Sequence, residues 1–159
     1  DMPRSKEEHL FEFHDPGKLV DGDLELLLID KYPGDPALRW APAYRFKMTL
    51  VGRNDLVGRI DLRMGNTEHI LMYAGHIGYG VEEAHRGHHY AARACRLLMP
   101  LARSHGMQEL WITCNPDNIA SRRTCELAGA TFVEIVDLPR ETDMYRHGER
   151  QKCRYRLDL

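Results

Sequence analysis

Arg86-Gly87-His88-His89-Tyr90-Ala91 is the stretch that decides the fold of this chain. It follows a β-type run, His76-Ile77-Gly78-Tyr79-Gly80-Val81, and opens a segment whose apolar residues recur at helical spacing (Ala91, Ala94, Leu97, Leu98, Leu101 and Ala102). A strand that turns sharply into a helix presents unpaired backbone N–H groups at the positive end of the helix dipole. Such an end binds phosphate without special side chains. The alternative is an ordinary β-to-α connection.

The strand before this turn is marked by its glycines. Because side chains alternate between the two faces of a strand, Gly78 and Gly80 share a face with His76. Glycine in a strand often marks a bulge or a close approach by a ligand or another backbone. The pattern therefore predicts a slot for an elongated ligand, with a glycine-rich strand under a bulky neighbour as the alternative.

A second unit follows the helix. Residues 109–113 read as a short buried strand, and residues 114–118 have the composition of a turn. The pattern then predicts a helix over residues 119–128 that ends at Gly129, followed by a strand over residues 131–136. The central unit is thus strand, turn, long helix, strand, turn, short helix and strand.

On these motifs, residues 75–134 resemble the acetyl-coenzyme A core of the GNAT superfamily of N-acetyltransferases. They are most similar to the branch that includes ribosomal-protein N-terminal acetyltransferases. The pyrophosphate loop of the family reads Gln/Arg-x-x-Gly-x-Gly/Ala, and residues 86–91 fill it. His89 stands where the family has glycine, so we expect it to hold helical dihedral angles with its ring turned away. The second motif, Asn-x-x-Ser/Ala before a helix, is matched by Asn118 and Ser121.

The resemblance implies an α/β (α+β) fold with a mixed, largely antiparallel central sheet, a splayed cofactor strand and flanking helices. We expect a single domain over residues 23–159, preceded by an amino-terminal arm, residues 1–22, in which residues 5–13 form either a helical turn or a mobile segment. The implied cosubstrate is acetyl-CoA. The residues expected to bind it are Gly80, Val81, Arg86, Gly87, His88, His89, Tyr90, Ala91, Asn118 and Ser121.

The implied reaction moves an acetyl group from acetyl-CoA to a primary amine of a small molecule or protein, by direct attack in a ternary complex. The amine must lose a proton, and His76 is the first candidate base because histidine titrates near neutrality. Its alternative role is a backbone hydrogen bond at a strand start, with Glu68 and Asp61 as reserve bases. As the catalytic acid, the family often has a tyrosine seven residues after the motif asparagine. Here that position is Cys125, which is either the catalytic acid or a small core residue, in which case water protonates the leaving thiolate.

Composition agrees with this interpretation. A chain of 159 residues suits one domain, and a net charge of −2 argues against an unspecialised nucleic-acid binder. Four scattered cysteines, with no signal peptide or membrane span in the sequence, predict a cytoplasmic protein with reduced thiols. The neighbouring histidines 85, 88 and 89 lack partners at ligand spacing, so no metal site is expected. The expected partners are acetyl-CoA and an amine acceptor, without nucleic acid or membrane, and a homodimer is left open.

The acceptor side is less defined. In the family two helices separate the first two strands and form one wall of the acceptor site, whereas here residues 31–43 form a short proline-containing loop. The wall is therefore abbreviated, or it is supplied by Trp40, Tyr44 and a neighbouring chain. Two other functions remain open: a non-catalytic CoA-binding sensor or regulatory module, and an interaction module whose glycine-rich strand receives a peptide edge.

Overall fold

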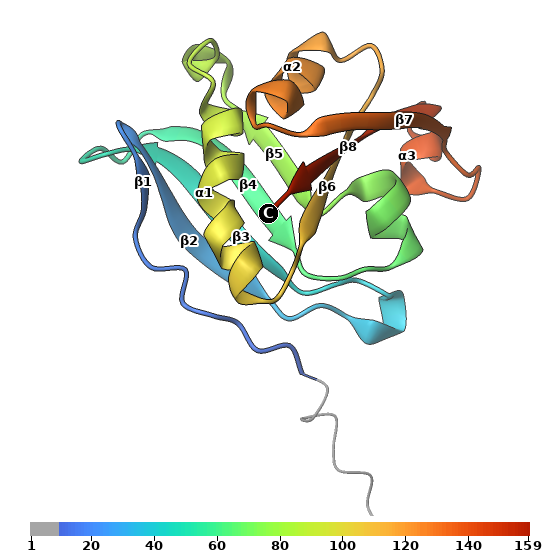
Figure 1. The fold of residues 1–159 in the computed structure, drawn as a ribbon, viewed down its shortest axis with the longest axis horizontal. Helices are drawn as coiled ribbons and strands as arrows, with labels where there is room; N and C mark the ends of the chain where they lie inside the picture. Colours follow the sequence, from blue (N-terminus) through green and yellow to red (C-terminus); the bar gives the residue numbers. More distant parts are fainter. Residues whose placement is uncertain (1–9) are drawn as a thin grey trace, which may run out of the picture.

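A computed structural model describes residues 10–159 as one eight-stranded sheet flanked by helices (Figure 1). The strands run in the order β1-β2-β3-β4-β5-β6-β8-β7. Every neighbouring pair is antiparallel except β5 and β6, which are parallel, so the predicted mixed, largely antiparallel sheet is confirmed. The strands are β1 (Leu19–Asp21), β2 (Leu24–Tyr32), β3 (Ala43–Leu50), β4 (Leu56–Arg63), β5 (Ile77–Val81), β6 (Glu109–Cys114), β7 (Thr131–Asp137) and β8 (Gln151–Asp158).

Helices lie mainly on one side of this sheet. The long helix α1 (Tyr90–Ser104) crosses the middle of one face, and α2 (Ile119–Leu127) lies beside it near β6 and β7 (Figure 1). The other helical pieces are short. They are η2 (Pro36–Leu38), η3 (Ile70–Ala74), η4 (Glu83–His85) and α3 (Asp143–Arg146).

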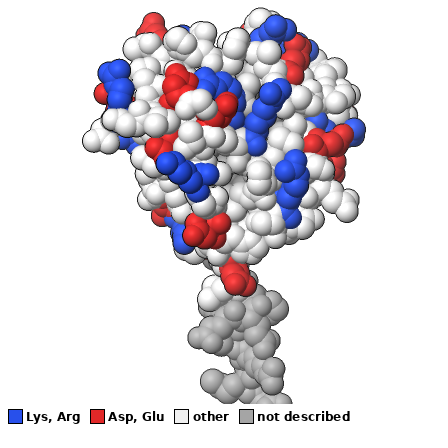
Figure 2. Space-filling model, turned by 60° about the vertical axis from the view of Figure 1, so that its left-hand side comes forward, with Lys and Arg blue, Asp and Glu red and all other residues white. Residues whose placement is uncertain are grey.

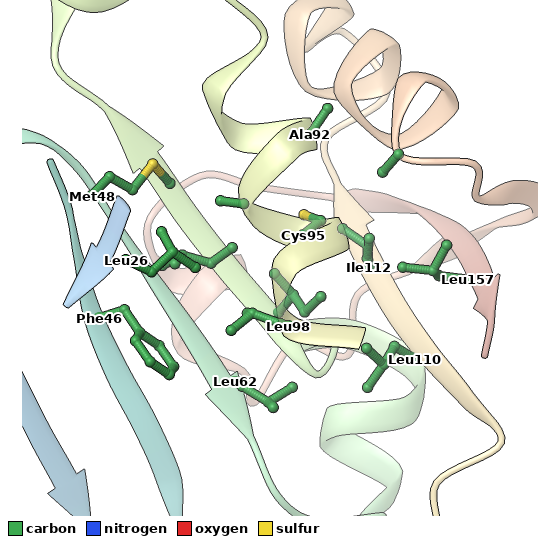
Figure 3. Close-up of a cluster of buried hydrophobic side chains, with 14 of the residues drawn as sticks. Leu26, Phe46, Met48, Leu62, Ala92, Cys95, Leu98, Leu110, Ile112 and Leu157 are labelled. Atoms are coloured by element: carbon green, nitrogen blue, oxygen red, sulfur yellow. The ribbon is translucent and has the colours of Figure 1, made fainter. Parts of the chain in front are cut away.

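The core lies between α1 and the sheet. Figure 3 shows Cys95 and Leu98 of α1 between Phe46 and Leu62 on one side and Ile112 on the other. All five side chains are at most 1% exposed. Fully burying a side chain of this size contributes about 1.5–3 kcal/mol. This packing holds α1 against the sheet and fixes the position of its amino-terminal end.

The amino-terminal region joins the sheet earlier than expected. The sequence predicts a first strand from Leu24, but residues 19–21 already form β1, which pairs with β2 across a turn at Gly22 with φ +57°. Phe11 and Phe13 pack against the core. The helical turn or mobile segment expected over residues 5–13 lies largely outside the described residues. The arm of residues 1–22 and the domain of residues 23–159 therefore stay a prediction, with β1 inside the range given to the arm.

The sheet opens between β5 and β6. These strands are paired only at Ile77 and Ile112. Beyond Ile77 the edge of β5 that faces β6 has no strand partner, and the two strands diverge toward the start of α1. The predicted splayed strand is thus present, and it opens beside the loop at residues 86–91.

The surface mixes charges of both signs. Figure 2 shows Lys and Arg side chains interspersed with Asp and Glu over one face, in agreement with the net charge of −2. No helix among residues 10–159 is long and apolar enough to cross a bilayer.

Candidate active site

The loop before α1 presents free backbone donors. The N–H groups of residues 87–92 have no acceptor within the part of the chain that the structure describes, whereas the N–H of Arg93 donates to the His89 carbonyl at 3.0 Å. Gly87 has φ +94°, and a Cβ built on it would meet nothing within 4 Å. The loop is open at this point, and its donors lie at the positive end of the α1 dipole. This geometry suits a phosphate group.

His89 does not hold the helical dihedral angles that the sequence led us to expect. It precedes the first residue of α1 with φ 58° and ψ 28°, in the left-handed region. The glycine of the family motif adopts this conformation without strain, whereas a residue with a Cβ pays about 1–2 kcal/mol for it. The loop therefore keeps the backbone path that glycine would take, although histidine occupies the position.

A pocket of about 870 Å³ runs from this loop into the gap between β5 and β6. Nine of the ten residues predicted to bind the cosubstrate line it: Gly80, Val81, Arg86, Gly87, His89, Tyr90, Ala91, Asn118 and Ser121. The tenth, His88, does not line it, and its ring lies 5.2 Å from the Tyr90 ring. Tyr90 is buried and donates to Asp23 Oδ2 at 3.0 Å, so it packs beneath the loop.

The start of α2 forms the second wall of the pocket. The Asn118 side chain caps the helix by accepting from the Ser121 N–H at 3.0 Å. The Ser121 hydroxyl is in turn hydrogen bonded to the Tyr79 hydroxyl at 2.5 Å. Burial raises the pKa of Tyr79, so the phenol holds its proton. The two hydroxyl groups bridge α2 and β5 across the gap.

Cys125 lies behind these hydroxyl groups. It is fully buried and does not line the pocket. A hydrogen bond with the neighbouring Cys114 thiol, together with burial, raises the pKa of Cys125. Cys114 does line the pocket, at the end of β6. The environment of Cys125 is thus that of a core residue.

His76 is held within the protein. It is 1% exposed and does not line the pocket. Its Nδ1 accepts from the Trp111 N–H at 2.9 Å, and its Nε2 lies 3.1 Å from the Gly65 carbonyl oxygen. Burial lowers the pKa of His76 to about 4. A neutral imidazole with both nitrogens engaged joins β6 to the segment before η3, which is the structural alternative considered for this residue.

The opposite face of the sheet carries a second pocket of about 530 Å³. Asp61, one of the two reserve bases, lines it and is half-buried, whereas the other, Glu68, is exposed and lines neither pocket. Burial raises the pKa of Asp61. Of the residues expected to form the acceptor wall, Trp40 is 60% exposed, but Tyr44 is a core residue whose hydroxyl accepts from the His14 N–H.

Sequence reasoning missed several residues of the larger pocket. Arg63 lines both pockets, and its guanidinium donates to the carbonyls of Ala74 and Gly75 at 3.1 and 3.0 Å. Lys152 and Glu149 form an ion pair of 2.7 Å at the far end of the larger pocket. No local motif marks these residues, because strand pairing brings them to the site from distant parts of the chain.

Comparison with known proteins places this geometry in context. A family model described as an acetyltransferase (GNAT) domain matches residues 21–131. A search of curated proteins finds no sequence match. Many solved structures share the fold.

Three of these structures illustrate how similar they are to this chain in fold and in sequence. RimL, a ribosomal L7/L12 alpha-N-protein acetyltransferase in complex with coenzyme A, has a TM-score of 0.65 at 15% identity, with 89% of this chain and 98% of that chain covered. The microcin C7 self immunity acetyltransferase MccE, in complex with acetyl-CoA and AMP, has a TM-score of 0.58 at 15% identity, with 74% of this chain covered. An acetyltransferase (GNAT family) from Bacillus anthracis has a TM-score of 0.55 at 20% identity, with 72% of this chain covered. The chain spans only 61% of MccE and 65% of the Bacillus anthracis protein.

Proposed function

The chain belongs to the acetyltransferase (GNAT) domain family, and on that premise we propose that it transfers an acetyl group from acetyl-CoA to a primary amine. The observation that carries the proposal is the gap between β5 and β6, which opens directly onto the free N–H groups of residues 87–92 within one pocket. A ligand with a diphosphate and a long arm fits this arrangement. Complexes with acetyl-CoA or coenzyme A are known for MccE and RimL.

Different residues of the pocket would bind the diphosphate and the long arm of this ligand. The diphosphate would be held by the main-chain donors of residues 87–92, with Arg86 and Arg123 in the pocket lining to balance its charge. The arm would lie in the gap, along the unpaired edge of β5. The acetyl thioester supplies an electrophilic carbonyl carbon. Backbone N–H groups on the free edge of β5 would stabilise the oxyanion as the amine attacks.

We propose that Asp61 is the general base that accepts the proton of the acceptor amine. Its carboxylate has no ion pair or side-chain hydrogen bond within residues 10–159, and burial raises its pKa. Asp61 pairs with Gly78 of β5 and lines the smaller pocket together with Gly78 and Gly80, which also line the larger one. His76 has no comparable access, since both of its ring nitrogens have protein partners. We therefore propose a positioning role for His76 and not the catalytic role first considered.

We propose that the hydroxyl pair of Ser121 and Tyr79 donates the proton that the leaving thiolate takes up. The nitrogen lone pair forms the C–N bond, the C–S bond breaks, and the sulfur takes a proton from a hydroxyl in the pocket lining. Ser121 and Tyr79 both line the pocket and share a 2.5 Å hydrogen bond, so the proton that the sulfur takes from the serine is replaced from solvent through the phenol, while Asp61 releases the amine proton to solvent. Cys125, the first candidate acid, lies behind them.

The test combines binding and turnover. Titration calorimetry with acetyl-CoA should show saturable binding that Gly87→Val weakens by at least about tenfold, because a β-branched residue would strain a backbone with φ +94° and shift the loop that presents the N–H donors. Release of free thiol should then depend on an added primary amine. Direct attack also requires that no acetylated protein appears in intact-mass spectra when the amine is withheld. Absence of heat, or thiol release without an acetylated amine, would refute the proposal. Binding without any turnover would favour the sensor function.

We also propose a cytoplasmic location and a homodimer. All four cysteines are free thiols, which suits a reducing compartment. The edge strand β7 exposes Phe132, Val133 and Ile135 by 40–45%, and an exposed apolar edge strand favours pairing with a second copy. Light scattering after size-exclusion chromatography should give twice the monomer mass, and Val133→Lys should return it to the monomer.

A further inference from the structure

The smaller pocket is distinguished by its charge. It lies on the face of the sheet opposite α1, and Arg45, Arg59, Arg63 and Asp61 all line it. Three guanidinium groups against one carboxylate leave a positive excess at a place where a positively charged amine would have to enter. An arrangement of this kind suits a ligand that brings its own negative charge.

None of the three arginines is fully neutralised by a partner. The Arg59 side chain is exposed and has no ion pair or hydrogen bond within the described residues 10–159. The partners of Arg63 are the carbonyl oxygens of Ala74 and Gly75 and not a carboxylate. Arg45 has one carboxylate partner, Asp30, at 3.4 Å and with both side chains more than 40% exposed. Guanidinium groups therefore remain available to an anion.

The register of the sheet connects this pocket to the proposed acetyl position. Asp61 pairs with Gly78 and Arg59 with Gly80, so all four lie on one face, whereas Tyr79 faces the α1 side. A Cβ on Gly78 would come within 2.6 Å of the Arg63 Nη2, and a Cβ on Gly80 would meet nothing within 4 Å. The bare backbone at Gly80 thus leaves open space on this face, and the two pockets share Arg63, Gly78, Tyr79 and Gly80 in their linings.

We infer that this pocket binds the acceptor and selects an acidic one: a primary amine with a carboxylate about one residue away. Asp61 would receive the ammonium group while Arg59 and Arg45 bind the carboxylate. Asp61 and Arg59 are two residues apart on β4, roughly 7 Å along the strand, which matches the reach of an amino acid or a peptide amino terminus. The inference rests on the proposed acetyl transfer and names its substrate class.

Matched acceptors test the inference. The tripeptide amides Ala-Glu-Ala and Ala-Gln-Ala, and the amino acid α-amides of glutamate and glutamine, form two pairs in which only the acidic member carries a carboxylate. We expect kcat/KM to be at least about tenfold higher for the acidic member of at least one pair, as a charge-assisted hydrogen bond allows. The pair that shows the bias identifies a peptide terminus or a free amino acid as the source of the amine.

Two variants complete the test. Arg59→Gln should reduce the acidic-to-neutral ratio to about twofold or less, mainly through the KM of the acidic acceptor, and leave the KM for acetyl-CoA unchanged. Lys47→Gln is the control, because Lys47 pairs with Arg59 across β3 and β4 but does not line the pocket, and it should keep the full ratio. Equal rates for both members of both pairs would overturn the inference while acetyl transfer itself stands. If the preference for acidic acceptors is unchanged in Arg59→Gln, the inference is also overturned. If no amine is acetylated, the proposed function fails first and the inference falls with it.

Discussion

The sharpest prediction concerns His76 and the pH dependence of stability. Burial lowers its pKa from 6.5 to about 4, so the folded state strongly favours the neutral imidazole. A group whose pKa is depressed on folding contributes stability that is fully present above its unfolded pKa and is lost as the pH falls toward its folded pKa. The contribution of His76 should therefore be constant above about pH 6.5 and decline between about pH 6.5 and 4.

The magnitude follows from the same shift. Each pKa unit corresponds to about 1.4 kcal/mol, so a shift of about 2.5 units is worth about 3.4 kcal/mol once the imidazole is protonated in both states. Between about pH 7.5 and pH 4.5, most of this, about 2.5 kcal/mol, should disappear from the free energy of unfolding. The loss is large because the ring is 1% exposed and both nitrogens have protein partners.

Urea denaturation of the native protein and of His76→Gln measures the effect. Glutamine cannot titrate, and its amide retains an acceptor for the Trp111 N–H and a donor for the Gly65 carbonyl. Other groups, including His105 with its lowered pKa, contribute equally to both proteins. The free energy of unfolding of the native protein should thus fall by about 2.5 kcal/mol more than that of His76→Gln between about pH 7.5 and 4.5.

Two results would contradict this reasoning. Parallel stability curves for the two proteins would show that His76 does not carry the shift. A loss of kcat by roughly a hundredfold or more in His76→Gln, with stability preserved, would restore His76 as the catalytic base.

Three further predictions follow from the contacts around β5. A Cβ on Gly58 would lie 2.3 Å from the Gly80 carbonyl oxygen, so Gly58→Ala should lower the unfolding free energy by about 2 kcal/mol, whereas Gly80→Ala, with open space, should change it by less than about 1 kcal/mol in the same urea titration. Ser121→Ala and Tyr79→Phe should each reduce kcat by roughly ten- to a hundredfold in a thiol-release assay, with little change in the KM for acetyl-CoA, and unchanged kcat would exclude them as the acid. At the left-handed position, His89→Val should cost about 1–2 kcal/mol in thermal denaturation while His89→Gly does not, and equal melting temperatures would argue against strain there.

The sequence predicted the central unit because its signals are local. The helix at residues 119–127 follows from its cap, Asn118, whose side chain accepts the Ser121 N–H as expected, and from Gly129, which has φ +93°. Outside that unit, the sequence also predicts a hairpin of residues 44–51 and 56–64 around a polar turn, and the structure has β3 and β4 there. Periodicity and turn residues specify such elements without knowledge of their partners.

The remaining differences arise from contacts between distant segments. Strand β1 is only three residues long and depends on pairing with β2. The short helix α3 lies in a stretch whose composition is typical of turns, since four residues give little periodicity. Our proposal places the base at Asp61 and not at His76, because burial and accessibility depend on the whole sheet. The arginines of the smaller pocket come from β3 and β4 and have no shared motif.

The single residue pair between β5 and β6 has a mechanical consequence. Strands β1–β5 and strands β6, β8 and β7 form two blocks that share a single strand pair. They are also joined by α1, which packs on both, by the hydrogen bonds of His76 with Trp111 and by the Tyr79–Ser121 hydrogen bond. A molecule bound in the gap would contact both blocks and restrict their motion relative to each other. Amide hydrogen exchange should therefore be slower in both blocks when coenzyme A is present, and the ligand would make one cooperative unit out of two.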